Sequence, residues 1–143
     1  MCKKLIFVIS LLLAAAALLS ACGSAAKLSE YDFGTDKVPS VNAVIGEERK
    51  VTGVETGTTN GVRYKQYTYE SATVAEDLIA YTARLRGSGW LVTKDYNLAD
   101  AKGEAELATE SADSGKILIL SIAFETGKYA IRVNKLDGSL TSN

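Results

Sequence analysis

Two pairs of carboxylates are the residues of this sequence that come closest to a general acid–base catalytic site. Asp95 and Asp100 flank one expected loop, and Glu104 and Glu106 are two residues apart on an expected strand, where alternate side chains share a face. Glycoside hydrolysis uses two such carboxylates, one on each side of a cleft. The chain of 143 residues contains no histidine, the commonest general base near neutral pH. We therefore favour a simpler interpretation, a solvated acidic edge that discourages strand pairing.

Two other short patterns do not complete a site. Ser24 and Lys27 have the Ser-x-x-Lys spacing of penicillin-binding enzymes, but the Ser-Asp-Asn and Lys-Thr-Gly motifs that work with it are missing. Residues 95–100 begin like a calcium-binding loop, but Ala99 occupies the fifth position and no glycine follows at the sixth. The sequence therefore predicts no metal site, no cofactor and no catalytic residues.

The first part of the chain has the arrangement of an export signal. Lys3 and Lys4 form a positive end, and residues 5–21 are apolar except for Ser10 and Ser20. A positive end stays on the cytoplasmic side while the apolar segment enters the membrane. The apolar run is marginal for a membrane span, which needs about 20 residues. An uncleaved N-terminal membrane helix is the alternative.

The end of this segment, Leu19-Ser20-Ala21-Cys22, resembles the lipobox of bacterial lipoproteins. The resemblance implies that residues 1–21 are removed as a signal peptide and that the sulfur of Cys22 carries a diacylglycerol. It also implies a protein anchored in the cell membrane by lipid, facing the periplasm or the cell surface. Two or more acyl chains make such an anchor stable. Cys2 leaves with the signal peptide, so Cys22 is the one cysteine that remains.

Charge and length limit the classes of partner. Without Lys3 and Lys4 the chain keeps 14 of its 16 basic residues against 17 acidic ones, a net charge of −3. The charges are spread along the chain and form no basic patch for a phosphate backbone, so we exclude nucleic acid as a partner. Residues 22–143 suit one domain that folds without disulfides.

The chain divides into a tether, one domain and a short tail. Residues 22–39 are small and polar without periodicity, which predicts a flexible tether behind the lipidated cysteine. Tyr31 and Phe33 can dock on the domain and shorten that tether. We expect the domain over residues 40–138 and a frayed tail over residues 139–143.

Hydrophobic periodicity predicts an α+β domain. One helix packs on one mostly antiparallel sheet, in the order β-β-α-β-β-β-β. The expected strands are residues 44–55, 62–69, 90–96, 104–110, 117–124 and 129–133, and the helix is 73–86. The connections include a hairpin loop at 56–61, a loop at 97–102 and a tight turn at 125–128. Residues 104–110 also have good helix propensity, so strand and helix both remain open there.

Two elements carry more specific predictions. Thr73 and Glu76 have the spacing of a capping box, and Gly87 and Gly89 end the helix. The side chains that share one face of this helix are Val74, Leu78, Tyr81, Thr82 and Leu85. Residues 117–124 are apolar on both parities, which predicts a central strand buried on two sides.

A strand rich in tyrosine is the candidate binding surface. Tyr64, Tyr67 and Tyr69 alternate with Arg63 and Lys65, and tyrosine and arginine are enriched at interface centres. A bulge near residues 65–66 would bring the aromatic side chains to one face; without it, both faces are partly aromatic. The alternative is that these tyrosines are core, because they are good strand formers. Trp90, directly after Gly89, is also expected in the core.

These observations favour a binding role over a catalytic one. We expect a non-catalytic binding or accessory domain of the cell envelope, held at the membrane through Cys22, whose partner is another envelope protein or a ligand. A small envelope hydrolase that uses aspartate or glutamate is the alternative. An inhibitor of an envelope hydrolase is a further alternative.

Overall fold

A sheet of six antiparallel strands carries one long helix and a small hairpin on a single face. The computed structural model of the chain describes residues 28–141. The predicted signal peptide, the lipobox with Cys22 and the Ser24–Lys27 pattern lie outside the described residues. The elements in chain order are β1 (Glu30–Phe33), β2 (Asp36–Pro39), α2 (Val41–Ile45), β3 (Lys50–Thr59), β4 (Val62–Glu70), α3 (Val74–Gly87), β5 (Leu91–Lys94), β6 (Lys102–Glu110), β7 (Lys116–Glu125) and β8 (Lys128–Asp137).

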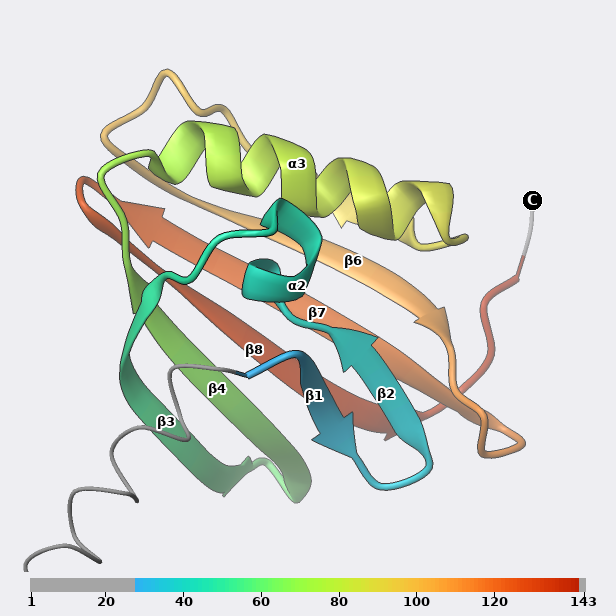
Figure 1. The fold of residues 1–143 in the computed structure, drawn as a ribbon. Helices are drawn as coiled ribbons and strands as arrows, with labels where there is room; N and C mark the ends of the chain where they lie inside the picture. The colour runs from blue at the N-terminus through green and yellow to red at the C-terminus, as the bar shows by residue number, and fades with distance from the viewer. Residues whose placement is uncertain (1–27, 142–143) are drawn as a thin grey trace, which may run out of the picture.

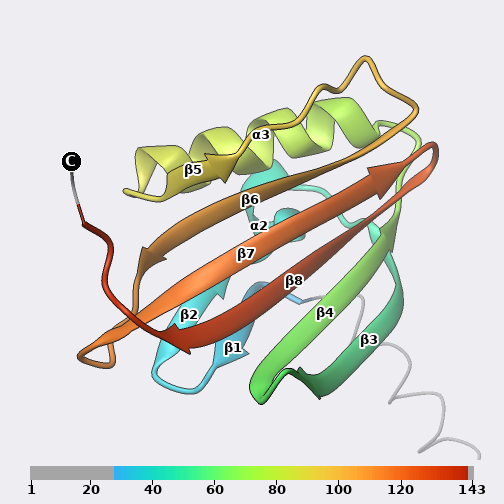
Figure 2. The ribbon, with the colours of Figure 1, turned by 180° about the vertical axis from the view of Figure 1, so that it is seen from behind.

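The chain crosses the sheet by way of α3. The strand order is β3-β4-β8-β7-β6-β5, and every neighbouring pair is antiparallel. Because β4 lies beside one edge and β5 forms the other, the connection that contains α3 has to pass from one side of the sheet to the other, and α3 itself lies at a shallow angle to the strands, alongside β6 (Figures 1 and 2). α3, α2 and the β1–β2 hairpin all lie in front of the same face (Figure 1). Seen from behind, the other face has no described element over it (Figure 2), and we call it the open face.

The predicted class is confirmed in its coarse form, while the predicted order of elements is incomplete. From β3 onward the chain follows the expected β-β-α-β-β-β-β series, with a strand at residues 102–110. The prediction omitted β1, β2 and α2, which precede this series. Each of them has only four or five residues, too few to display a periodicity.

The prediction of a flexible tether over residues 22–39 is wrong for its described part, because β1 and β2 pair as an antiparallel hairpin. Tyr31 and Val38 are each 1% exposed and belong to the core. The Tyr31 ring stacks on Tyr67 with centroids 4.4 Å apart, and the hydroxyl oxygens of Tyr31 and Tyr69 are 2.6 Å apart. The folded domain therefore includes this hairpin.

The core lies between α3 and the face that it covers. Leu78, Tyr81 and Leu85 are fully buried, as their helical spacing predicts, and Trp90 is buried beside them. Alternate side chains of the two central strands complete the core: Leu118, Leu120, Ile122 and Phe124 from β7, and Tyr129, Ile131 and Val133 from β8.

The prediction that residues 117–124 are buried on both sides is wrong. The side chains of Ile117, Ile119 and Ser121 belong to the open face and are half-buried. An antiparallel sheet can face water on one side. The apolar residues on both parities of β7 therefore reflect its central place between β6 and β8. Among the described residues, no second layer covers the open face.

The β3–β4 hairpin has a shorter turn than predicted. The last four residues of β3 pair with the first four of β4, so the turn is Asn60-Gly61. Both residues have positive φ, 51° and 78°, which a two-residue hairpin turn of this kind requires. The strand irregularity lies in β3 between Val51 and Gly53, and β4 pairs with β8 without interruption. The two faces of β4 are therefore both partly aromatic.

The predicted capping box at the start of α3 is wrong. Thr73 makes no side-chain cap hydrogen bond, and its hydroxyl instead donates to the carboxylate of Asp77 at 3.2 Å. Asp77 lies one turn further on and is only 3% exposed. A buried carboxylate attracts every donor within reach, because an unpaired one costs free energy. The helix ends at Gly87, one residue after the predicted Arg86.

We expect Tyr31→Ala to lower the free energy of unfolding by about 3 to 5 kcal/mol, because it removes a buried aromatic ring from a filled core. Tyr31→Phe keeps the ring and loses the hydroxyl contact with Tyr69, which should cost about 1 kcal/mol. Urea denaturation measures both. Wild-type stability in Tyr31→Ala would mean that the hairpin is a tether after all.

Candidate functional site

The five predicted binding residues divide among three places. Tyr67 and Tyr69 are buried in the core, at 6% and 0% exposed, so the alternative interpretation holds for them. Arg63 and Lys65 share the parity of these tyrosines but lie beyond them, at the end of the sheet near the β1–β2 turn. Tyr64 belongs to the open face. No single surface contains all five.

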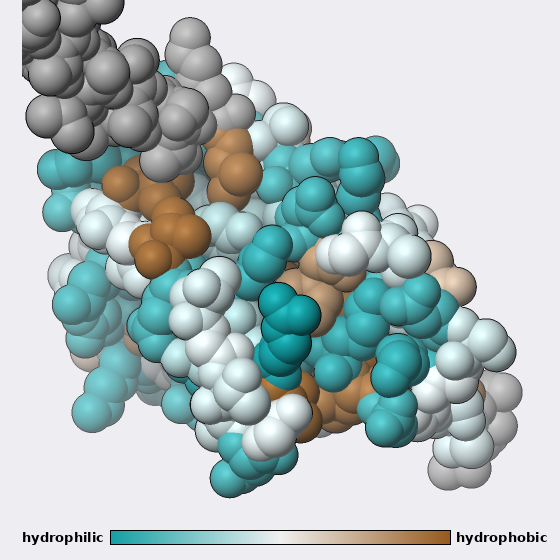
Figure 3. Space-filling model, turned by 90° about the horizontal axis from the view of Figure 1, so that it is seen from below, coloured by the Kyte–Doolittle hydropathy of each residue, from teal (hydrophilic) through white to brown (hydrophobic). Residues whose placement is uncertain are grey.

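The end of the sheet that holds Arg63 and Lys65 contains a cavity of about 720 Å³. Hydrophilic and hydrophobic side chains lie side by side on this lower face of the molecule (Figure 3). Lys135 also lines the cavity, but its ammonium group lies 2.7 Å from both Asp36 and Asp113.

The other lysines of this cavity have partners as well. Lys116 pairs with Asp137 at 2.6 Å, and Lys65 donates to the Asp32 carbonyl oxygen at 2.6 Å. Carboxylates therefore compensate Lys116 and Lys135, whereas the carbonyl oxygen holds the Lys65 ammonium without neutralising its charge.

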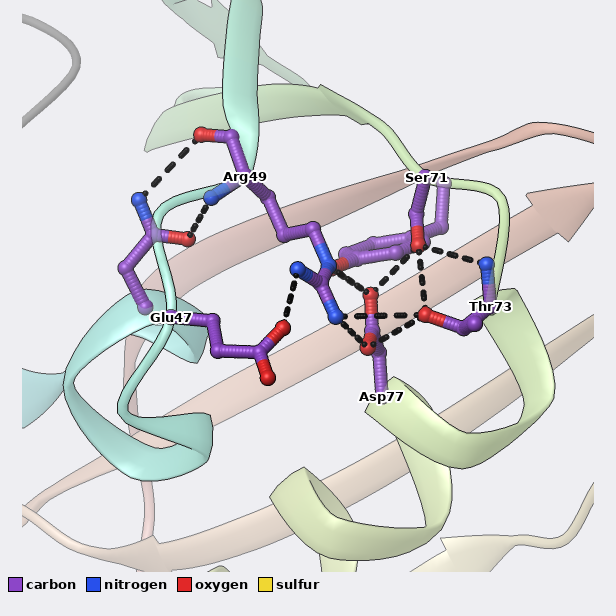
Figure 4. Close-up of polar contacts among 7 residues, drawn as sticks. Glu47, Arg49, Ser71, Thr73 and Asp77 are labelled. Atoms are coloured by element: carbon purple, nitrogen blue, oxygen red, sulfur yellow. Dashed lines mark hydrogen bonds and ion pairs between the residues drawn. The ribbon is translucent and has the colours of Figure 1, made fainter.

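The densest polar cluster surrounds Asp77 at the start of α3 (Figure 4). Arg49 donates to both carboxylate oxygens, from Nε and Nη2 at 2.8 Å each. The hydroxyl groups of Ser71, Thr73 and Tyr129 donate to the same carboxylate at 2.6, 3.2 and 3.1 Å. With five donors on one buried carboxylate, the cluster is complete without a ligand.

The carboxyl group of Asp77 stays ionised and the hydroxyl group of Tyr129 stays protonated in this cluster. Burial alone would raise the pKa of Asp77, but the hydrogen bonds from Arg49, Ser71 and Tyr129 outweigh it, and the pKa is lowered. Burial and the nearby Asp77 charge raise the pKa of Tyr129 well above its ordinary value, so its hydroxyl remains a donor. We assign the cluster to holding the fold together.

The open face carries a transverse row of polar residues. In the register of the sheet, Gln66 of β4 pairs with Arg132 of β8, Arg132 with Ser121 of β7, and Ser121 with Glu106 of β6. The row ends at Lys94 of β5, which pairs with Glu106. Five strands from distant parts of the sequence therefore bring opposite charges onto one line.

Arg132 is the best-positioned side chain of this row. Its guanidinium lies 4.2 Å from the centre of the Tyr64 ring, and its Nε donates to the Gln66 amide oxygen at 2.8 Å. The Tyr64 hydroxyl in turn donates to Glu55, which raises the pKa of Tyr64. A β-carbon on Gly57 would come within 2.9 Å of the Tyr64 ring, so the absence of a side chain there makes room for it.

Arg132 has no counter-charge among residues 28–141. It is half-buried, whereas Arg63, Arg84 and Arg86 are exposed. The other half-buried arginine, Arg49, forms ion pairs with two carboxylates. A guanidinium held in place by a ring and an amide, without a carboxylate, is arranged to receive an oxyanion.

A cavity of about 360 Å³ opens beside this guanidinium. Gln66 and Arg132 line one side, and Glu104, Glu106 and Lys94 line the other. Small side chains form the part between them, at Ser121, Ala123 and Ala130. This cavity on the open face is the candidate site.

The four predicted acidic residues do not form one carboxylate pair. Asp95 and Asp100 are exposed in the β5–β6 connection and line none of this cavity. Glu104 and Glu106 share the open face, as their spacing predicts. The ammonium of Lys94 hydrogen bonds to Glu104 at 2.8 Å and lowers the pKa of that carboxyl group. Glu106 accepts a hydrogen bond from the Thr93 hydroxyl at 2.9 Å.

Sequence reasoning missed Arg132 and Gln66. A signal for each is present in the neighbouring residues, which point to the other face of the sheet: Gln66 precedes the aromatic Tyr67, and Arg132 stands between the apolar Ile131 and Val133. Their proximity follows only from the strand order, which places β8 beside β4 across 60 and more residues of chain.

Comparison with known proteins gives no match. A scan against protein-family models finds none, and searches of curated proteins and of solved structures find none either. Within residues 28–141, no helix is long and apolar enough to cross a membrane, and no group of three histidine, cysteine or acidic side chains is arranged to hold a metal ion.

Stability should fall in acid through Asp77. Its pKa is lower in the folded chain than the value near 3.9 of an unfolded aspartate, so the stabilisation is complete above that value and is lost as the pH falls through the folded pKa. Asp77→Asn should lower the free energy of unfolding at neutral pH by about 3 to 5 kcal/mol, because it removes the buried charge partner of Arg49 and leaves only the exposed Glu47. It should also reduce the loss of stability below about pH 4.

Urea unfolding between neutral pH and about pH 2 measures both effects of this variant. The control is Asp100→Asn at an exposed position, which should change stability by less than about 0.5 kcal/mol. An equal change in the two variants would contradict the central role of Asp77.

Tyr64→Leu should release Arg132, because it removes the ring on which the guanidinium lies. Nuclear magnetic relaxation of the Arg132 Nε–H group measures this as a fall in its order parameter. Tyr64→Phe is the matched control: it keeps the ring and loses only the hydrogen bond to Glu55, so Arg132 should stay ordered. The same order parameter in all three proteins would show that the ring does not hold the arginine.

Proposed function

We propose that the protein is a lipid-anchored, non-catalytic binding domain of the bacterial cell envelope, and that the open face is its binding surface. The observation that carries the proposal is Arg132, half-buried in the middle of that face and held by Tyr64 and Gln66 without a carboxylate. Positioned arginine and tyrosine side chains in a concave surface are typical of binding sites. The anchor rests on the lipobox pattern that ends at Cys22.

The arrangement of charges favours binding over hydrolysis. Hydrolysis by two carboxylates needs one of them to keep its proton near neutral pH, which requires a raised pKa. Lys94 shifts the pKa of Glu104 downward, so Glu104 does not meet the requirement for the proton-keeping member of such a pair. A domain that inhibits an envelope hydrolase would use the same surface, so identifying the partner decides between an inhibitor and another accessory role.

Crosslinking in living cells tests this proposal. A photo-reactive residue in place of Ala123, which is exposed in the cavity of the open face, should capture a component of the envelope. The same residue in place of Ile79, 57% exposed on α3, is the matched control and should capture little. Equal capture at both positions, or none at Ala123, would contradict a protein-binding open face.

The same cells test the anchor. Cys22→Ser removes the sulfur that the lipid would occupy, so the variant should move from the membrane fraction to the soluble fraction. Its crosslinks at Ala123 should weaken if the partner is confined to the membrane. A wild-type protein already found in the soluble fraction would contradict the anchor.

A further inference from the structure

We propose that the cavity on the open face binds both charged ends of a short peptide, the carboxyl terminus at Arg132 and the amino terminus at Glu106. This inference rests on the proposed function, because it takes the open face as the binding surface and names the class of ligand.

Arg132 would bind the carboxylate end of the peptide. Its Nε is engaged by Gln66 and one face of its plane by Tyr64, and neither contact neutralises its charge. Arginine is the side chain best suited to a carboxylate, because its donors match the two oxygens. The ring and the amide fix the guanidinium before a ligand arrives, which reduces the entropy lost on binding.

Glu106 would bind the ammonium end of the peptide. Of the two glutamates that line the cavity, Glu104 is compensated by the ammonium of Lys94 at 2.8 Å. Glu106 accepts a hydrogen bond from the neutral Thr93 hydroxyl and forms no ion pair within residues 28–141. Its negative charge therefore remains available to a ligand, on the opposite side of the cavity from Arg132.

The spacing selects the length of the ligand. In the register of the sheet, Arg132 and Glu106 lie two strands apart with Ser121 between them. Neighbouring strands are about 4.8 Å apart, so these backbone positions are about 10 Å from each other, and the Arg132 guanidinium lies further from Glu106 because it is turned toward Gln66 and Tyr64 of β4. An extended residue spans about 3.3 Å, so at least three residues fill the gap.

The small side chains between Arg132 and Glu106, and the opposite charges of these two residues, favour a peptide over a simple ion. Ser121, Ala123 and Ala130 leave room for a peptide backbone, in a cavity of about 360 Å³. A simple anion at Arg132 would leave Glu106 uncompensated, and a simple cation at Glu106 would leave Arg132 uncompensated. A molecule with a charge of each sign at its two ends satisfies both.

Calorimetric titration with trialanine tests the inference. The full chain should bind trialanine, and either amidation of its carboxyl end or acetylation of its amino end should weaken binding at least about tenfold. Arg132→Gln should remove the preference for the free carboxylate over the amide. Glu106→Gln should remove the preference for the free amine over the acetylated form.

Matched controls separate these effects from general charge. Arg63→Gln changes an exposed arginine on the other face of the sheet, and Glu76→Gln changes an exposed glutamate on α3; both should bind like wild type. No binding of trialanine at millimolar concentration would overturn the inference, and so would an amidated or acetylated form that binds as tightly as free trialanine.

The outcomes distinguish this inference from the proposed function. Capture of an envelope protein at Ala123 without trialanine binding would refute the peptide-end site and leave the binding surface standing. Trialanine binding that depends on Arg132 and Glu106, without capture at Ala123, would support the inference and refute a protein partner.

Discussion

The buried charge of Asp77 is the constraint on which this fold depends. A carboxylate that is 3% exposed needs donors, and its five come from separate parts of the chain. Four residues supply these five donor groups: Arg49 before β3 with two, Ser71 and Thr73 before α3, and Tyr129 of β8. The side chain of Asn42 in α2 contacts both the backbone N–H and the carbonyl oxygen of Arg49, which fixes the arginine in turn. Both helices and the sheet are therefore joined through one charge.

The hairpin missed by sequence reasoning has a geometric purpose in this architecture. α3 lies at a shallow angle to the strands, so it covers little more of the sheet's width than its own diameter of about 10 Å, whereas six strands spaced about 4.8 Å apart make a sheet about 24 Å wide. One helix cannot cover such a face, and the remainder would expose Tyr67 and Tyr69. β1 and α2 cover this remainder, and Tyr31 stacks on one of these rings and contacts the hydroxyl of the other. Tyr81 donates to the carbonyl oxygen of Pro39 at 3.0 Å, which links α3 to the end of the hairpin.

The elements that could be predicted from sequence are those long enough to display a period. The buried stripe of α3, the hairpin of β7 and β8, and the antiparallel sheet itself belong to this group. The predictions that were wrong depended on which groups distant parts of the chain bury. Thr73 has the spacing of a cap, yet the buried carboxylate of Asp77 competes for its hydroxyl. Tyr67 and Tyr64 have the same propensity for a strand, and only the face that α2 and β1 cover decides which of them is core. The candidate site likewise depends on strand order, which a single sequence does not encode locally.

The two half-buried arginines of the domain illustrate how the two faces differ. Arg49 lies where α3 packs on the sheet, and the fold compensates its charge with Asp77 and Glu47. Arg132 lies on the open face, where Gln66 and Tyr64 orient it and compensate nothing. Orienting a guanidinium restricts a flexible side chain and removes part of its hydration, both of which cost free energy. Because Glu106 is two strands away and is not used as its partner, the domain keeps two opposite charges apart on one surface. A separation of this kind adds nothing to the stability of the chain alone, and it has a physical use once a ligand of complementary charge lies between them.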